Sequence, residues 1–150
     1  MVAIEIVRVE PSADQALAEL ILAVQKGSYA VEAGLIGDDR IPVLHESVDD
    51  LSAAQVHWLV AREGDEILGA AAWSNSEIDR LVVSPHAHRR GIGRALVDAM
   101  LESIVARRVH VATGRDNSPA RRLYESVGFV HTEDRQVLPG LWLARYELVR

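Results

Sequence analysis

The sequence of 150 residues contains no cysteine. Disulfide bonds, zinc sites built on thiolates and a cysteine nucleophile are therefore excluded. No apolar run approaches the roughly 20 residues that a membrane-spanning helix needs. The opening residues, MVAIEIVRVE, lack the basic start and the apolar block of a signal peptide. We therefore expect a soluble, cytoplasmic protein that makes no contact with a membrane.

An excess of basic residues is also missing. The 16 Lys and Arg residues are outnumbered by 22 Asp and Glu residues, which gives a formal net charge of -6. No broad basic surface is implied, so we do not expect binding to nucleic acid. With 49% hydrophobic and 25% charged residues, the composition is that of an ordinary globular protein. The length predicts one domain, over residues 1–150, with a sizeable core.

The hydrophobic periodicity of the sequence predicts a mixed α/β chain. The expected elements are, in chain order, a strand at 4–9, a helix from an N-cap at Ser12 to about Gly27, a mostly irregular segment with a short helix at 28–46, a short helix from Ser47, strands at 56–63, 66–73 and 77–84, a helix at 91–107, a strand at 109–113, a helix at 118–127, and strands at 128–136 and 141–149. The helix at 91–107 joins its two flanking strands in a right-handed parallel crossover. Ligands tend to bind at the carboxyl ends of such strands.

A glycine-containing loop, HRRGIGRAL from His88 to Leu96, stands between a predicted strand and a predicted helix. The start of a helix can direct free backbone N–H groups at phosphate oxygens, and glycine lets the phosphates come close. The loop lacks the Lys-Ser/Thr of a Walker loop, and it does not match the GxGxxG of dinucleotide-binding folds. Taken alone, the pattern fits a phosphate site or a simple tight turn equally well.

A second block, NSPARRLYESVGF, extends from Asn117 to Phe129. Together the two blocks resemble the GNAT superfamily of acyl-CoA-dependent N-acetyltransferases. The family loop, Gln/Arg-x-x-Gly-x-Gly/Ala after Val-x-Pro, matches Val83-Ser84-Pro85 and the segment 88–93. The family block Asn-x-x-Ala-x-x-Leu-Tyr-x-x-x-Gly-Phe matches the second block at every marked position. The chain departs from the family at His88, where Gln or Arg is usual.

This resemblance implies a single-domain α/β fold. The sheet is expected to be mixed and mostly antiparallel, with about seven strands, about four helices and a central parallel β-α-β crossover. The implied reaction moves an acetyl group from acetyl-CoA, the co-substrate, to a primary amine. A small-molecule acceptor is favoured, and acetylation of a protein N-terminus or lysine is the first alternative. A coenzyme A-binding regulatory subunit without turnover is the second, and a homodimer is left open.

The resemblance also implies a coenzyme site, in which backbone groups of two strand residues pair with the pantetheine arm and the glycine loop holds the pyrophosphate. Asn117 would contact the coenzyme or fix the loop beneath it, while Ala120 would leave it room. The implied coenzyme residues are Leu81, Val83, His88, Arg89, Arg90, Gly91, Ile92, Gly93, Arg94, Asn117 and Ala120. His86 and His88 have no third ligand in view, so no metal is expected.

Acetyl transfer to an amine needs a proton acceptor and a proton donor, because an alkyl amine with a pKa of about 10 arrives protonated. Glu77, at the start of the strand before the loop, is the candidate base, with Asp79 two residues on as the alternative. Tyr124 resembles the family tyrosine that protonates the coenzyme A sulfur. The structural alternatives are a solvated carboxylate for Glu77 and a packed ring for Tyr124.

The acceptor is expected to be held by the segment between the first two helices and by the last hairpin, as in the family. Tyr29 and Glu32 are the candidate acceptor-binding residues of the first region. Glu46, Trp142 and Tyr146 are further candidates. Each of the five could instead belong to the loop surface or to the core.

Overall fold

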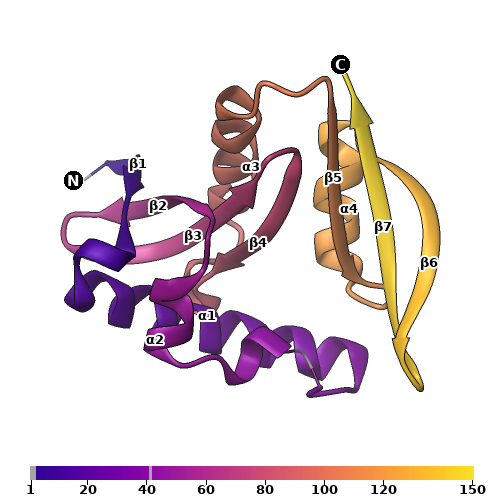
Figure 1. The fold of residues 1–150 in the computed structure, drawn as a ribbon, viewed down its shortest axis with the longest axis horizontal. Coiled ribbons are helices and arrows are strands. Elements are labelled where there is room, and N and C mark those ends of the chain that lie inside the picture. Colours follow the sequence, from indigo (N-terminus) through magenta and orange to yellow (C-terminus); the bar gives the residue numbers. More distant parts are fainter. Residues whose placement is uncertain (1–2, 41) are drawn as a thin grey trace.

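The strands predicted from hydrophobic periodicity form one seven-stranded sheet with helices on both faces, in a computed structural model that describes residues 3–40 and 42–150 (Figure 1). The strands are β1 (Ile4–Val9), β2 (His57–Glu63), β3 (Glu66–Ser74), β4 (Glu77–Val83), β5 (Arg108–Gly114), β6 (Val130–Leu138) and β7 (Leu141–Val149). The α-helices are α1 (Gln15–Ile36), α2 (Val48–Ala53), α3 (Ile92–Ser103) and α4 (Ser118–Val127). The strand order is β1-β2-β3-β4-β5-β7-β6. The predicted fold class is confirmed.

Neighbouring strands run antiparallel except for β4 and β5, which are parallel and joined through α3. Their paired position is Glu77 with His110, near the start of both strands. From there the strands separate toward their carboxyl ends; we call this gap in the strand pairing the opening, and α1 passes below it (Figure 1). The separation therefore divides the sheet at the end where ligands are expected.

The core has two parts, one on each face of the sheet. The first packs α3 and α4 against the sheet and includes Leu96, Met100 and Phe129. The second packs α1 and α2 against the other face and includes Ile21 and Leu51. Val82 on β4 is 0% exposed and belongs to this second part.

Helix α1 differs from the prediction at both ends. Its N-cap is Asp14, whose Oδ1 accepts a hydrogen bond from Leu17 N at 3.1 Å, because Ser12 lies in a short 3-10 turn. The helix also passes through Gly27, where an added Cβ would lie 3.3 Å from Pro85 Cδ. Close packing against that turn explains a glycine inside a helix. The helix ends at Gly37, with φ of 69°, so the expected irregular segment is wrong over 28–36.

The rest of that segment agrees better with the sequence. A 3-10 turn spans Pro42–His45, and residue 41 lies outside the described residues. Helix α2 begins after Ser47 with a capping box, since Ser47 Oγ accepts from Asp50 N and Asp50 Oδ2 accepts from Ser47 N. Helix α3 is shorter than predicted, because the chain turns to an extended conformation at Ile104. Local capping chemistry therefore set these boundaries.

Candidate active site

Helix α1 bridges the separated ends of β4 and β5. Ser28 Oγ accepts a hydrogen bond from Val83 N at 3.4 Å, and Glu32 Oε1 accepts one from Gly114 N at 3.4 Å. Ser28 and Glu32 are one helical turn apart, so consecutive turns of α1 contact the two strands. A Cβ on Gly114 would lie 2.9 Å from Ile36 Cγ2, so glycine permits this approach. Helix α1 therefore forms the floor of the opening.

The glycine loop opens α3 at the rim of this opening. Gly91 is the N-cap with φ of 76°, no side chain caps this end of the helix, and an added Cβ would meet nothing within 4 Å. The start of α3 therefore combines an exposed glycine with the lack of a side-chain cap, which suits an anion site. Gly93 has a different reason, because its Cβ would lie 3.2 Å from Leu123 Cδ2 on α4. Gly93 lets α3 and α4 pack closely.

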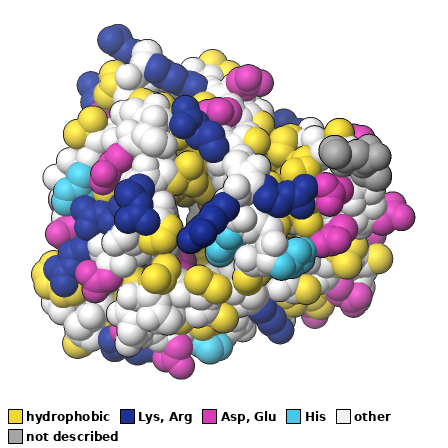
Figure 2. All heavy atoms as spheres, turned by 180° about the vertical axis from the view of Figure 1, so that it is seen from behind, with side chains coloured by type: hydrophobic (Ala, Val, Ile, Leu, Met, Phe, Trp, Pro, Cys, Tyr) yellow, Lys and Arg dark blue, Asp and Glu magenta, His cyan; other side chains and the backbone are white. Residues whose placement is uncertain are grey.

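The loop side chains are mostly engaged with neighbours. His88 Nε2 lies 3.3 Å from Val83 O, Arg90 pairs with Glu63 at 2.7 Å, and Arg94 pairs with Asp98 at 3.5 Å. Arg89 is exposed and adopts a positive φ of 67°. Ile92 is 2% exposed and lies in the core, so only its backbone could reach a ligand. On the face opposite to Figure 1, Lys and Arg side chains border a hollow near the middle of the molecule (Figure 2).

The inner edge of β4 presents backbone groups toward β5. Ser84 N donates to Leu68 O on β3 at 2.8 Å, so alternation directs the N–H and C=O groups of Val83 to the opposite side. Those groups contact the side chains of Ser28 and His88 instead of another strand. Leu81 is in phase with Val83, two residues earlier. An extended ligand arm could pair with this edge as an added strand would.

Tyr124 is held in the opening by α4. Asn117 caps this helix through Oδ1, which accepts from Ala120 N at 3.2 Å. The Tyr124 ring contacts Phe129 edge-on at 5.6 Å between centroids, and its side chain is buried. Burial raises the pKa of Tyr124 well above its usual value, and the charge of Glu32 adds to the rise. The hydroxyl is therefore protonated at neutral pH, and no described residue hydrogen-bonds to it.

The predicted acceptor residues Tyr29 and Glu32 come together with Tyr124. Burial raises the pKa of Tyr29, and the charges of Glu32 and Asp79 add to this effect. Burial also raises the pKa of Glu32, although hydrogen bonds from Asn117 and Gly114 oppose it. Two phenols and one carboxylate thus share the opening.

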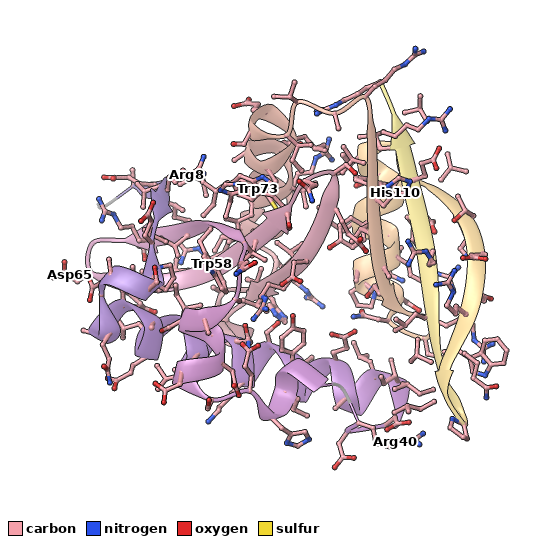
Figure 3. The ribbon with its side chains drawn as sticks, in the orientation of Figure 1. Arg8, Arg40, Trp58, Asp65, Trp73 and His110 are labelled. Carbon is pink, nitrogen blue, oxygen red and sulfur yellow. The ribbon has the colours of Figure 1, made fainter. Side chains whose placement is uncertain are left out.

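Glu77 lies at the closed end of the opening. It is exposed and forms the parallel pair with His110, whose side chain is labelled in Figure 3. Asp79 occupies a β-bulge, because Trp73 pairs with Ile78 while the preceding residue of β3 pairs with Arg80. Asp79 Oδ2 accepts from Arg80 Nε at 2.6 Å. Its carboxylate is therefore already used as a counter-ion.

Arg80 is the residue that the sequence analysis missed. Its side chain is 5% exposed and donates to Glu46 Oε1 at 2.7 Å and to Gln25 Oε1 at 3.1 Å. The guanidinium lies 5.1 Å from the ring centroid of Trp58, on the face of the sheet that α1 and α2 cover (Figure 3). The available signal was an arginine at an inward strand position between Ile78 and Val82. Glu46, a predicted acceptor candidate, lies in this buried network.

The two remaining acceptor candidates, Trp142 and Tyr146, lie on β7 of the final hairpin. Tyr146 is 1% exposed, and its hydroxyl donates to Glu125 Oε2 at 2.5 Å and accepts from Arg121 Nε at 2.8 Å. Arg115 lies over the Trp142 ring at 4.8 Å from the centroid, and its N–H donates to Trp142 O. Tyr146 therefore lies in the core, with its ring centroid 6.4 Å from that of Tyr124 and its hydroxyl already bonded to Glu125 and Arg121.

Neither His86 nor His88 belongs to a group of three or more candidate metal ligands among the described residues. His86 lies 2.8 Å from Ser84 Oγ through Nδ1 and 2.7 Å from Glu66 Oε1 through Nε2. None of the helices in residues 3–40 and 42–150 has the length and apolar character needed to cross a membrane.

The parallel pair β4–β5 that divides a mostly antiparallel sheet, the glycine start of α3 without a side-chain cap and the buried Tyr124 agree with the resemblance seen in the sequence. The family model described as "Acetyltransferase (GNAT) domain" matches residues 42–150. The chain belongs to this family of GNAT acetyltransferases.

Several known proteins are similar to this chain. UPF0157 protein YqkA of Bacillus subtilis (strain 168) is 35% identical over 137 residues, which cover 88% of this chain and 40% of YqkA. Mycothiol acetyltransferase of Beutenbergia cavernae is 42% identical over 81 residues, covering 48% of this chain and 27% of that protein. The chain thus spans less than half the length of either relative. The structure of yncA from Salmonella typhimurium with its cofactor acetyl-CoA shares the fold, at a TM-score of 0.71, 18% identity and coverage of 98% of this chain and 94% of that one.

Proposed function

We propose that this chain, as a single domain of residues 1–150, transfers an acetyl group from acetyl-CoA to the primary amine of a small molecule. The observation that carries the proposal is the buried Tyr124 close to Glu32, in an opening whose rim is the start of α3 without a side-chain cap. The name of the mycothiol relative supports a small-molecule acceptor. The cytoplasmic location belongs to the same proposal and rests on the sequence alone.

The residues at the rim fit acetyl-CoA. The N–H groups at the start of α3 would hold the pyrophosphate, with Arg89, Arg90 and Arg94 supplying positive charge and His88 at its edge. The inner edge of β4, at Leu81 and Val83, would pair with the pantetheine arm. Asn117 and Ala120 would border that arm from α4. When bound, acetyl-CoA supplies an activated acetyl thioester.

The reaction needs two proton transfers, one to the departing sulfur and one from the amine. Tyr124 would protonate the departing sulfur, since its raised pKa keeps the proton on the hydroxyl until the thiolate forms. Glu77 would accept the amine proton from the closed end of the opening, through water. Glu32 is the second candidate, because it lies close to Tyr124 and burial raises its pKa above the usual value. Tyr29 and Glu32 would also contact the acceptor.

Acetyl-CoA is expected to bind and to raise the melting temperature. A ligand that binds only the folded state stabilises it by about 2.7 kcal/mol at 100 times its dissociation constant. Adenosine alone should do much less, since the loop recognises the pyrophosphate. Isothermal titration calorimetry and thermal melting measure both effects. Absence of heat and of a melting shift at saturating acetyl-CoA would refute the proposal.

A glycine pair provides the matched control for this titration. Gly91 and Gly64 both have positive φ, 76° and 61°, and an added Cβ meets nothing within 4 Å at either. Gly91→Val and Gly64→Val should therefore strain the fold similarly, while only Gly91→Val weakens acetyl-CoA binding. Gly93→Val should also lower stability through Leu123. Equal affinity in the two matched variants would mean that the loop is only a turn.

The acceptor class is tested by following free thiol release from acetyl-CoA with separate panels of small primary amines and of peptides. Turnover with small amines supports the proposal. Turnover confined to peptides would favour the protein acetyltransferase. Tight coenzyme binding without turnover in either panel would favour the regulatory subunit.

The two candidate bases are separated by their pH profiles. Replacement of the base by glutamine should lower kcat at neutral pH and allow recovery as pH rises, because more of the amine is then already neutral. We expect kcat to recover at high pH in only one of the variants Glu77→Gln and Glu32→Gln. In the other, kcat should be lower than wild type by the same factor at every pH. If Glu32 is the base, wild-type kcat should also fall on the acid side as this carboxylate gains its proton. Profiles like wild type in both variants would leave a water chain as the proton acceptor.

A further inference from the structure

A pocket of about 450 Å³ lies at the end of the sheet remote from the glycine loop. We call it the His57 pocket; it is bordered by His57 of β2, Trp73 of β3, the turn 75–76 and the segment 103–106 at the end of α3. The 12 residues of α3 separate this segment from Gly91 by roughly 18 Å along the helix axis, at about 1.5 Å per residue. Small-molecule sites in proteins have volumes of about 300–1,000 Å³, so the His57 pocket is large enough for a ligand.

The loop after α3 holds an apolar side chain in solvent at the border of this pocket. Val105 is 99% exposed, whereas the preceding residue, Ile104, is 4% exposed and lies in the core. Arg150 fixes the backbone on both sides of Val105, because its guanidinium donates to Ile104 O and, at 3.1 Å, to Ala106 O. The exposure of Val105 is therefore set by a fixed loop, and its side chain offers apolar surface to a ligand.

A cation without a carboxylate partner stands at another border of the pocket. Arg8 Nη2 donates to His57 Nδ1 at 2.6 Å, and the guanidinium lies 5.5 Å from the ring centroid of Trp73 (Figure 3). Within residues 3–40 and 42–150, Arg8 forms no ion pair and no other side-chain hydrogen bond. Because arginine can only donate, His57 Nδ1 accepts this bond, and the neutral ring carries its proton on Nε2. That N–H is a further donor beside the cation.

The lining of the His57 pocket has no carboxylate in the part of the chain that the structure describes, although the sequence contains 22 Asp and Glu residues. Besides the histidine, its polar residues are Asn75, Ser76 and Ser103. Glu77 follows Ser76 directly, but it alternates with Ile78, which packs in the core beside α3, so Glu77 faces the other side of the sheet. Donors near an unpaired cation suit an anion, and the apolar lining suits a hydrocarbon group.

We propose that the His57 pocket is a second ligand site, which binds a small organic carboxylate. The carboxylate group contacts Arg8 and His57, because guanidinium and carboxylate form strong, charge-assisted hydrogen bonds. The hydrocarbon part packs against Trp73, Ile104 and Val105, which supply the apolar lining. None of these five residues belongs to the proposed coenzyme or acceptor site. Failure of acetyl-CoA binding would therefore leave this site standing, and failure of this site would leave acetyl-CoA binding intact.

Titration with phenylacetate tests the site, because this probe has a carboxylate on a hydrocarbon body that the pocket can hold. Phenylacetamide has the same body without the charge, and acetate has the charge without the body. In proton–nitrogen correlation NMR spectra, phenylacetate should give saturable shifts at the Ser76 and Val105 amides and at the Trp73 indole. Both control compounds should bind at least roughly tenfold more weakly. Saturating coenzyme A should leave the shifts in place, because the glycine loop lies at the other end of α3.

Two substitutions test the two parts of the contact. Arg8→Gln removes the charge and should weaken phenylacetate binding roughly tenfold or more. Val105→Ser removes apolar surface and should weaken it about threefold or more. At 99% exposure Val105 has no part in the core, so this variant stays informative even if Arg8→Gln lowers the melting temperature.

Arg62→Gln and Val137→Ser are the matched controls, since both side chains are also exposed, at 46% and 44%, and both lie away from the pocket. Neither should change the affinity for phenylacetate. Absence of saturable shifts, shifts confined to the glycine loop, or equal binding of either control compound would overturn the proposal. Unchanged affinity in Arg8→Gln or Val105→Ser, or equal losses in the matched controls, would overturn it as well.

Discussion

Tyr124→Phe is expected to lower kcat by roughly 100-fold or more while acetyl-CoA affinity stays close to that of the wild type. The substitution removes the hydroxyl proton but keeps the ring that packs against Phe129. Steady-state kinetics with the acceptor from the amine screen give kcat, and calorimetry gives the affinity. High pH should not rescue the variant, because the missing step is protonation of a thiolate.

Tyr146→Phe is the control, because Tyr146 is also buried and also loses only a hydroxyl. Its hydroxyl bonds to Glu125 and Arg121, so the free energy of unfolding should fall by about 1–3 kcal/mol. Its kcat should be nearly unchanged. An undiminished kcat for Tyr124→Phe would remove the general-acid role and leave the coenzyme site standing.

Arg80→Ala is expected to lower the free energy of unfolding by about 3–5 kcal/mol. The side chain is 5% exposed and faces the carboxylate of Glu46, itself 13% exposed. Removal leaves that carboxylate without its cation and takes one hydrogen bond from Gln25. Urea unfolding followed by circular dichroism measures the change. Glu46→Gln in the Arg80→Ala background should recover part of the loss, because it removes the unpaired charge.

An exposed ion pair supplies the comparison. Arg62 Nη2 lies 3.4 Å from Glu5 Oε2, and the two side chains are 46% and 62% exposed. Solvent screens such a pair, so Arg62→Ala should change the free energy of unfolding by no more than about 1 kcal/mol. Similar losses in both variants would mean that burial of Arg80 contributes little.

Local patterns predicted most elements of the fold. The hairpin turns, the capping box at Ser47 and the glycine after α4 each depend on a few neighbouring residues. The length of α1 could not be predicted in this way, because Gly27 normally weakens a helix. Contact with Pro85, far along the chain, gives that glycine its place.

The residues of the candidate site also differ in how far the sequence could predict them. The loop and Tyr124 could be predicted as site residues because each lies in a short contiguous motif. Arg80 joins partners 34 and 55 positions away, and Glu32 contacts a strand end 82 positions away. No local pattern carries such pairings, since they arise only when α1 crosses the opening. The sequence therefore suggested Glu32 as an acceptor residue without revealing that it lies beside Tyr124.

The single paired position between β4 and β5 divides the hydrogen-bonded sheet into two units. Strands β1 to β4 form one ladder, and β5, β7 and β6 form the other. Cooperative units in proteins open separately when few bonds connect them. The amides of β5–β7–β6 should therefore exchange with solvent hydrogen as a group of their own, less protected than those of β2 and β3. The contacts of α1 with both ladders then determine how independently the two ladders open.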